Sequence, residues 1–389
     1  MPGLRTTLAA ATALAAIAVP AHAQESVKIG IITTLSGPGA ALGQQLRNGF
    51  ELGLKEMGNK IGGLDAELVV MDDEQKPDVA VNRAKELVQR EDVDFVVGPI
   101  FSNIAQAIYK PITDAETFLV SPNAGPSDLA GAGCSPYFFA TSYQNDQNHA
   151  VLGKYAQDSG IASVVLLVPN YQAGKDSVAG FKRYYEGEIL DEIYTPLGQL
   201  DFSAELARIA SLQPEALFTF MPGGMGVNLV KQFRQAGLAD GVTFLSAFTV
   251  DESTLPAQQD AAVGLYGGSN WAPDMEQSAD FVESYIGAYD AVPASYAMHA
   301  YDTVLLLDAA ISAVDGDLQD KDALRQAIET AEFTSLRGDF SFGKNHFPVQ
   351  DFYLVQVAQR DDGKFETRIV EKVFDDAVDD YADQCTMGE

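Results

Sequence analysis

Two apolar stretches in the first third of the chain, 93–97 and 118–120, each run into a small, polar turn. The polar turn residues are Ser102, Asn103, Asn123, Ala124 and Gly125. We expect the first turn to open a helix, whose leading backbone N–H groups have no partner inside the helix. Two such turns side by side would hold a small anion or polar group. No nucleophile or acid–base pair lies near them in sequence, which favours binding without chemical change.

Other residues of chemical interest lack partners at a useful spacing. Gly37-Pro38-Gly39 does not continue as the G-x-G-x-x-G of a dinucleotide loop. The acidic run 71–74 has no histidine near it and is interpreted as a solvated strand end. His149, His299 and His346 each stand alone in sequence and are predicted to be packing or surface residues. We therefore predict no catalytic residue, no metal and no cofactor, and hence a protein that is not an enzyme.

The turns that could bind must be positioned by an alternation of strands and helices. Apolar periodicity predicts strands at 27–35, 66–71 and 92–97, with helices at 42–57 and 79–88 between them. After the polar stretch 142–146 the alternation starts again and continues to a strand at 242–247. Such alternation is typical of parallel sheets with helices on both faces, so the sequence predicts two similar α/β lobes.

A third region breaks this alternation. Helical patterns at 279–289, 295–314 and 321–329 follow one another without strands between them, and two strands are then predicted at 352–358 and 365–373. If the helices return to the first lobe and the strands to the second, the chain crosses between the lobes several times.

The first residues have the features of a secretory leader. Arg5 precedes an apolar run at 8–19, and Ala21-His22-Ala23 is a small-x-small cleavage signal, so we expect a signal peptide at 1–23. No later apolar run approaches the roughly 20 residues of a membrane span. The net charge of -30 argues against nucleic acid as a partner. The expected product is an exported, soluble protein, periplasmic in a Gram-negative source.

The chain has two cysteines, Cys134 and Cys385. Export permits a disulfide, which would tie the C-terminal tail to the body of the protein. The alternative is two separate thiols that never meet.

The strand ends of the second lobe carry large apolar side chains, namely Tyr171, Met221 and Phe248. Exposed strand ends usually carry polar residues, so this set predicts an apolar wall facing the polar turns of the first lobe. Local packing of these side chains is the alternative.

The stretches 29–38, 98–102, 121–124 and 170–174, in this order and spacing, resemble the type I periplasmic solute-binding proteins of ABC importers, in the branched-chain amino-acid-type (leucine-binding-like) group. The resemblance implies two α/β lobes, three interlobe crossings and closure on a ligand like a trap. It implies an N-terminal lobe of 24–142 plus 274–347 and a C-terminal lobe of 143–273 plus 348–389.

The resemblance also implies a site. The expected ligand-binding residues are Leu42, Ser102, Asn103, Asn123, Ala124, Gly125, Tyr143, Tyr171, Ala173, Met221, Phe248 and Thr249. Ser102 matches the family's carboxylate-binding serine. The amino-acid binders, however, place a threonine where Gly125 stands, a tyrosine where Ala173 stands and an acidic residue where Phe248 stands. A ligand ammonium beside Phe248 would lose its ion pair and its hydration together.

These departures predict a ligand with a carboxylate and an apolar, aromatic body, similar to the benzoates and coumarate-like acids carried by related importers. The implied partners are a membrane permease and its ATPase subunits, with the binding protein as a monomer that is not embedded in the membrane. The alternative ligand is a branched-chain amino acid or short amide. A receptor's ligand-binding domain and an exported enzyme are the competing classes.

Overall fold

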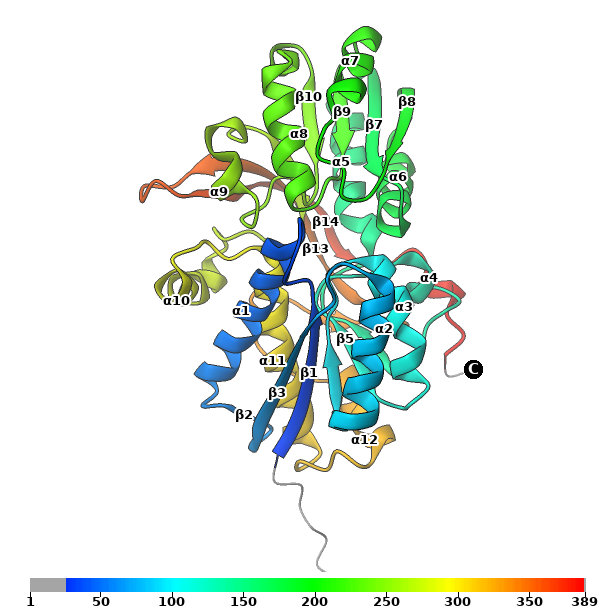
Figure 1. Cartoon of the computed structure of the whole chain (residues 1–389), viewed down its shortest axis with the longest axis vertical. Helices are drawn as coiled ribbons and strands as arrows, with labels where there is room; N and C mark the ends of the chain where they lie inside the picture. The colour runs from blue at the N-terminus through cyan, green and yellow to red at the C-terminus, as the bar shows by residue number, and fades with distance from the viewer. Residues whose placement is uncertain (1–25, 388–389) are drawn as a thin grey trace, which may run out of the picture.

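Two sheets, each flanked by helices, organise the computed structural model, which describes residues 26–387 (Figure 1). The predicted signal peptide at 1–23 lies outside the described residues. The first sheet and its helices form the lower lobe of Figure 1, and the second sheet with α6 to α8 forms the upper lobe. The predicted architecture of two α/β lobes is confirmed.

The first sheet has the strand order β2-β3-β1-β4-β5-β6. Its strands are β1 (Ser26–Thr33), β2 (Lys60–Ile61), β3 (Leu64–Asp72), β4 (Phe95–Val97), β5 (Phe118–Ser121) and β6 (Phe138–Ala140). The helices α1 (Ala40–Glu56), α2 (Pro77–Glu86), α3 (Ser102–Thr113) and α4 (Ser127–Ala130) connect them. Every residue of β4 and β5 is buried, which explains why these parallel strands appear in the sequence as unbroken apolar runs.

The second sheet has the order β12-β13-β11-β10-β9-β7-β8, with β14 paired to β13. Its parallel strands are β7 (Ser163–Pro169), β8 (Glu188–Thr195), β9 (Ala216–Thr219), β10 (Thr243–Ser246) and β11 (Tyr266–Ser269). The helices in this half are α5 (Asn145–Asp158), α6 (Gln172–Tyr184), α7 (Ser203–Leu212), α8 (Gly224–Gln235) and α9 (Leu255–Gln258). The antiparallel strands β12 (Ser341–Phe342), β13 (Pro348–Gln359) and β14 (Phe365–Ala377) complete the sheet.

The helices α10 (Ala279–Tyr289), α11 (Ser295–Ala313) and α12 (Lys321–Glu329) follow the second sheet in sequence. Helix α11 lies against α1 of the first lobe, where a Cβ on Gly49 would come within 2.1 Å of the Ala297 carbonyl oxygen. Gln45 of α1 also bonds the backbone at both Val292 and Ala294, just before α11. The chain therefore crosses between the lobes three times: after β6, after β11 and before β13.

The three crossings meet in a buried polar cluster, which we call the hinge cluster: Ser142, Asn270, Asp302, Arg337 and Gln350. Asn270 Nδ2 donates to Ser142 O and to Gln350 Oε1, and Gln350 Nε2 donates to Ser142 O at 2.7 Å. Arg337 donates to Ser142 O and Gln350 Oε1 and pairs with Asp302 at 3.2 Å, with both side chains 1% exposed. One arginine thus ties the first and third crossings together.

A disulfide joins Cys134 to Cys385, with the Cα atoms 5.7 Å apart. The terminal segment that contains Cys385 contacts both halves of the molecule. Asp379 accepts a hydrogen bond from Asn345, and Tyr381 donates to Asp146 at the start of α5. The tail is therefore tied to the body, as a bridge between these cysteines requires.

Candidate ligand-binding site between the lobes

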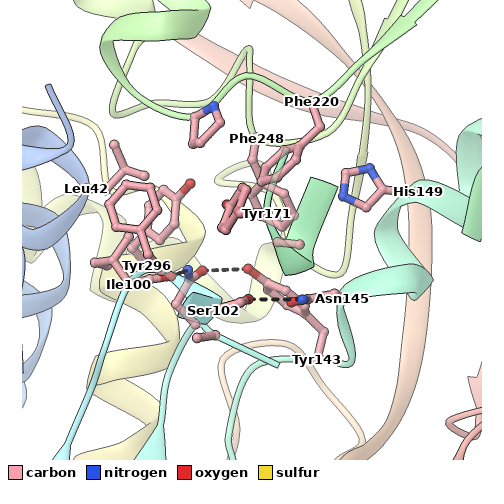
Figure 2. Close-up of a pocket in the computed structure, with 15 residues that line it drawn as sticks. Leu42, Ile100, Ser102, Tyr143, Asn145, His149, Tyr171, Phe220, Phe248 and Tyr296 are labelled. Carbon is pink, nitrogen blue, oxygen red and sulfur yellow. Dashed lines mark hydrogen bonds between the residues drawn. The ribbon is translucent and has the colours of Figure 1, made fainter. Parts of the chain in front are cut away.

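An enclosed cavity lies where the carboxyl ends of the parallel strands of both sheets face each other. The space open to the centre of a water-sized sphere is only about 20 Å³, room for about one water, so a ligand requires the lobes to move apart. It is lined by Leu42, Ile100, Phe101, Ser102, Asn123, Ala124, Tyr143, Asn145, His149, Tyr171, Ala173, Phe220, Pro222, Phe248 and Tyr296 (Figure 2). No residue in this lining is acidic.

The polar floor of the cavity is built around Ser102, the first residue of α3. Asn145 Nδ2 donates to Ser102 Oγ at 3.0 Å, as the dashed line in Figure 2 shows. Because Ser102 Oγ serves as the acceptor in this bond, its own hydrogen remains free to donate to a ligand. The leading backbone N–H groups of α3 add donors and the positive end of the helix dipole. These neutral donors suit a carboxylate.

Asn123 lines the cavity, but its amide is already used within the protein. Its Nδ2 donates to Ile100 O at 2.6 Å, and its Oδ1 accepts from the Tyr143 hydroxyl at 2.5 Å. Burial raises the pKa of Tyr143 well above its ordinary value, so its hydroxyl keeps the proton for this bond. Asn123 therefore orients the Tyr143 ring.

The opposite wall is aromatic and centres on Phe248. Its ring lies 5.1 Å from that of Tyr143, 6.2 Å from that of Phe220 and 6.2 Å from that of Tyr296, between centroids. Tyr171 stacks on Phe220 at 6.2 Å. Phe248 adopts φ 57°, a conformation that is unusual for a bulky residue and that holds its ring at the strand end. This wall matches the flat face of an aromatic ligand.

The structure brings eight of the twelve expected residues to the cavity. They are Leu42, Ser102, Asn123, Ala124, Tyr143, Tyr171, Ala173 and Phe248.

The other four expected residues, Asn103, Gly125, Met221 and Thr249, do not line the cavity. Met221 is buried in the core of the second lobe, and its N–H donates to Thr249 Oγ1 at 2.8 Å. Gly125 N–H donates to Asn145 Oδ1 and so supports the floor from behind.

Seven lining residues were not expected from the sequence: Ile100, Phe101, Asn145, His149, Phe220, Pro222 and Tyr296. Asn145 and His149 lie four residues apart and so share one face of α5. That spacing was the available signal, but 142–146 was interpreted only as a polar turn, and His149 as a packing or surface residue. Tyr296 comes from α11, far along the chain, and no local pattern marks it.

An acidic residue that was not expected from the sequence, Asp251, lies close to the aromatic wall. Asp251 is buried behind Phe248 and accepts a hydrogen bond from the Tyr296 hydroxyl at 3.3 Å. Asp251 and Glu252 line a second small enclosed space that Phe248 separates from the cavity. Burial raises the pKa of Asp251. No acidic side chain lies in the aromatic wall, but the Asp251 carboxyl group lies behind the Phe248 ring.

Contacts between the lobes close the cavity on two sides. Asp176 of α6 accepts hydrogen bonds from the side chains of Ser127, Asn145 and Gln172, at 2.7 to 2.8 Å. Burial raises the pKa of Asp176 to about 6. On the other side, Gly224 N–H at the start of α8 donates to Pro38 O at 3.0 Å. A ligand enters only when these contacts open.

Glu252 gives this region a pH-dependent stability. Its Oε1 accepts two hydrogen bonds from Thr367, yet burial raises its pKa from 4.5 to about 8. The folded chain therefore keeps a proton that the unfolded chain loses above pH 4.5. Stability should fall as the pH rises through this interval, by up to about 1.4 kcal/mol per pH unit from this group.

We expect Glu252→Gln to raise the melting temperature at pH 8 and to flatten its dependence on pH between 5.5 and 8. The matched control is Glu186→Gln at an exposed position. Thermal melts at the two pH values measure the difference. An equal change at both pH values would contradict the account.

Two α/β lobes joined by three crossings around an enclosed cavity define a two-lobed binding protein. The Periplasmic binding protein family matches residues 26–364, and the chain belongs to that family. Within 26–387, no helix is both long and apolar enough to cross a bilayer. In the same part of the chain, no three His, Cys, Asp or Glu side chains are placed to hold a metal ion.

The chain is similar to proteins from several bacteria. It is 30% identical over 380 residues to Leu/Ile/Val-binding protein homolog 6 of Brucella melitensis, covering 93% of this chain and 96% of that protein. An R. palustris solute-binding protein solved with benzoate is 30% identical, with a TM-score of 0.88, covering 93% of this chain and 100% of that chain. Another from R. palustris, solved with 4-hydroxybenzoate, is 29% identical, with a TM-score of 0.84, covering 90% and 98%.

Proposed function

We propose that the chain is the solute-binding component of an ABC importer and captures a small aromatic carboxylate, benzoate- or coumarate-like, between its two lobes. The observation that carries this proposal is the pairing of a neutral donor floor at Ser102 with an aromatic wall at Phe248, in a lining without an acidic residue. The family, and the aromatic acids bound by similar solved proteins, support the same ligand class.

The energetics favour an aromatic acid over an amino acid. Burial of one ring contributes roughly 2–4 kcal/mol at about 25 cal/mol per Å². A carboxylate finds the Ser102 hydroxyl and the start of α3. An ammonium in the same cavity would be desolvated against Phe248 with no ion pair.

The proposed working cycle is lobe closure rather than chemistry. A ligand first held by Ser102 and the start of α3 would be enclosed when Asn145, Tyr171 and Phe248 of the second lobe close over it. The closed form would then be delivered to a membrane permease and its ATPase subunits. For this role we propose that residues 1–23 are a signal peptide and that the protein is located in the periplasm. Closure of two lobes around one ligand requires only a monomer.

A branched-chain amino acid is the second candidate, and Asp251 is the observation that favours it. Its carboxyl group could receive an ammonium if Phe248 turned aside, because Phe248 separates Asp251 from the cavity. The similarity to a Leu/Ile/Val-binding protein homolog agrees with this alternative.

Titration calorimetry with benzoate, 4-hydroxybenzoate, 4-coumarate and leucine tests the proposal. We expect at least one aromatic acid to bind with Kd of about 10 μM or tighter, and leucine at least about 100-fold more weakly, a difference of about 2.7 kcal/mol. Mass analysis after incubation should return the ligand unchanged. Leucine binding tighter than every aromatic acid would reject the ligand class.

A further inference from the structure

His149 is a polar group of the cavity to which no residue of the described chain is hydrogen-bonded. It lies on α5, is 2% exposed, and its Nδ1 has no hydrogen-bond partner among residues 26–387. Its ring contacts are aromatic: Phe218 at 5.8 Å, Phe220 at 5.2 Å and Phe248 at 6.0 Å. A hydrocarbon ring would fill this position without leaving a polar atom unpaired.

An unpartnered buried nitrogen is costly, because it has lost its water and gained nothing in return. Buried polar side chains in folded proteins nearly always have a partner. His149 also lines the cavity, so a bound molecule is the group in a position to supply that partner. Burial lowers the pKa of His149 to about 3. The ring is therefore neutral and presents one acceptor and one donor nitrogen.

The position of His149 along α5 fixes which end of a ligand it meets. Asn145 holds the carboxylate floor, and His149 follows it by one turn on the same face, a rise of about 6 Å along the helix axis. That rise is comparable to the long axis of a substituted benzene ring. In Figure 2, Ser102 and Asn145 lie at one end of the drawn group, with His149 beside Phe220 toward the other.

We propose that His149 is the specificity residue for a hydroxyl group on the ligand's ring, at the end remote from the carboxylate. This inference rests on the proposed function and narrows it to hydroxylated aromatic acids. The phenolic O–H donates to the acceptor nitrogen of the neutral imidazole, and Phe220 and Phe248 keep water away from the bond. An unsubstituted ring leaves the nitrogen unpaired, so it should bind more weakly.

The test compares benzoate with 4-hydroxybenzoate, and cinnamate with 4-coumarate, by calorimetry on the full chain. In the wild type we expect the hydroxylated member of at least one pair to bind about tenfold more tightly or better. His149→Phe keeps a ring against its aromatic neighbours and removes both nitrogens. It should abolish the preference, so that the two members of a pair bind this variant with equal affinity. His149→Asn, which keeps a polar atom near the Nδ1 position, should restore part of it.

The wild-type series alone tests the inference if a variant fails to fold. Equal affinity for the two members of both pairs would overturn it and leave the aromatic-acid proposal standing. A preference for the hydroxyl that survives in His149→Phe would also overturn it. If no aromatic acid binds the wild type, the proposed function fails first, and that outcome is distinct from both of the others.

Discussion

Replacing Phe248 with glutamate is expected to lower the affinity for an aromatic acid roughly 1,000-fold. Loss of the ring removes about 2–3 kcal/mol of apolar burial, and an added carboxylate beside the ligand's own costs about 2 kcal/mol more. A total above about 4 kcal/mol corresponds to three powers of ten in Kd. Calorimetry with the tightest-binding aromatic acid measures the loss.

Phe248→Leu is the matched control, because it shortens the wall without adding charge. We expect it to weaken binding only about tenfold. The glutamate variant should also be titrated with leucine, since the new carboxylate would face the cavity and could pair with an ammonium. Unchanged affinity for both ligands in Phe248→Glu would place Phe248 outside the site and contradict the proposed function.

Removal of the hinge-cluster arginine should produce the largest loss of stability. Arg337→Met leaves Asp302 buried without its ion-pair partner and takes donors from Ser142 O and Gln350 Oε1. Breaking a buried ion pair by deleting one member costs about 3–5 kcal/mol. Because the cluster holds the crossings between the lobes, we expect a marked fall in melting temperature and loss of a single cooperative transition.

Two further variants separate the hinge cluster from a general effect of losing an arginine. Arg325→Met on α12 removes an arginine from a more exposed pair with Asp322 and should cost no more than about 1 kcal/mol. Combining Arg337→Met with Asp302→Leu should recover part of the loss, since no charge is then left unpaired. Equal melting temperatures for Arg337→Met and Arg325→Met would contradict the assignment of the hinge cluster.

The elements were predictable wherever local pattern decides them. The predicted helices at 279–289 and 321–329 agree with α10 and α12 residue for residue. The last two strands are longer than predicted, because polar residues interrupt the apolar pattern where the strands extend, at Gln350 and Asp351 in β13 and at Asp375 and Asp376 in β14. Apolar periodicity predicts the buried part of such a strand. It gives no signal where one face of the strand is exposed to solvent.

The site was predictable at strand ends and not at the crossings. Ser102, Tyr171 and Phe248 follow strands directly, so their place at the carboxyl edge of a sheet follows from the fold. Tyr296 depends on the return of α11 to α1, a long-range contact that no local pattern encodes. The role of Gly125 was also not predictable from a local pattern. A Cβ there would meet the Tyr143 carbonyl oxygen at 2.0 Å, so the threonine of amino-acid binders does not fit this backbone.

The most direct measurement is a crystal structure of the protein grown with 4-hydroxybenzoate. We predict a ligand carboxylate within hydrogen-bond distance of Ser102 Oγ, the ring against Phe248, and both lobes in contact around it. A ligand bound elsewhere on the surface would contradict that picture. A bound amine that forms a salt bridge with Asp251, with the Phe248 ring turned out of the cavity, would also contradict it.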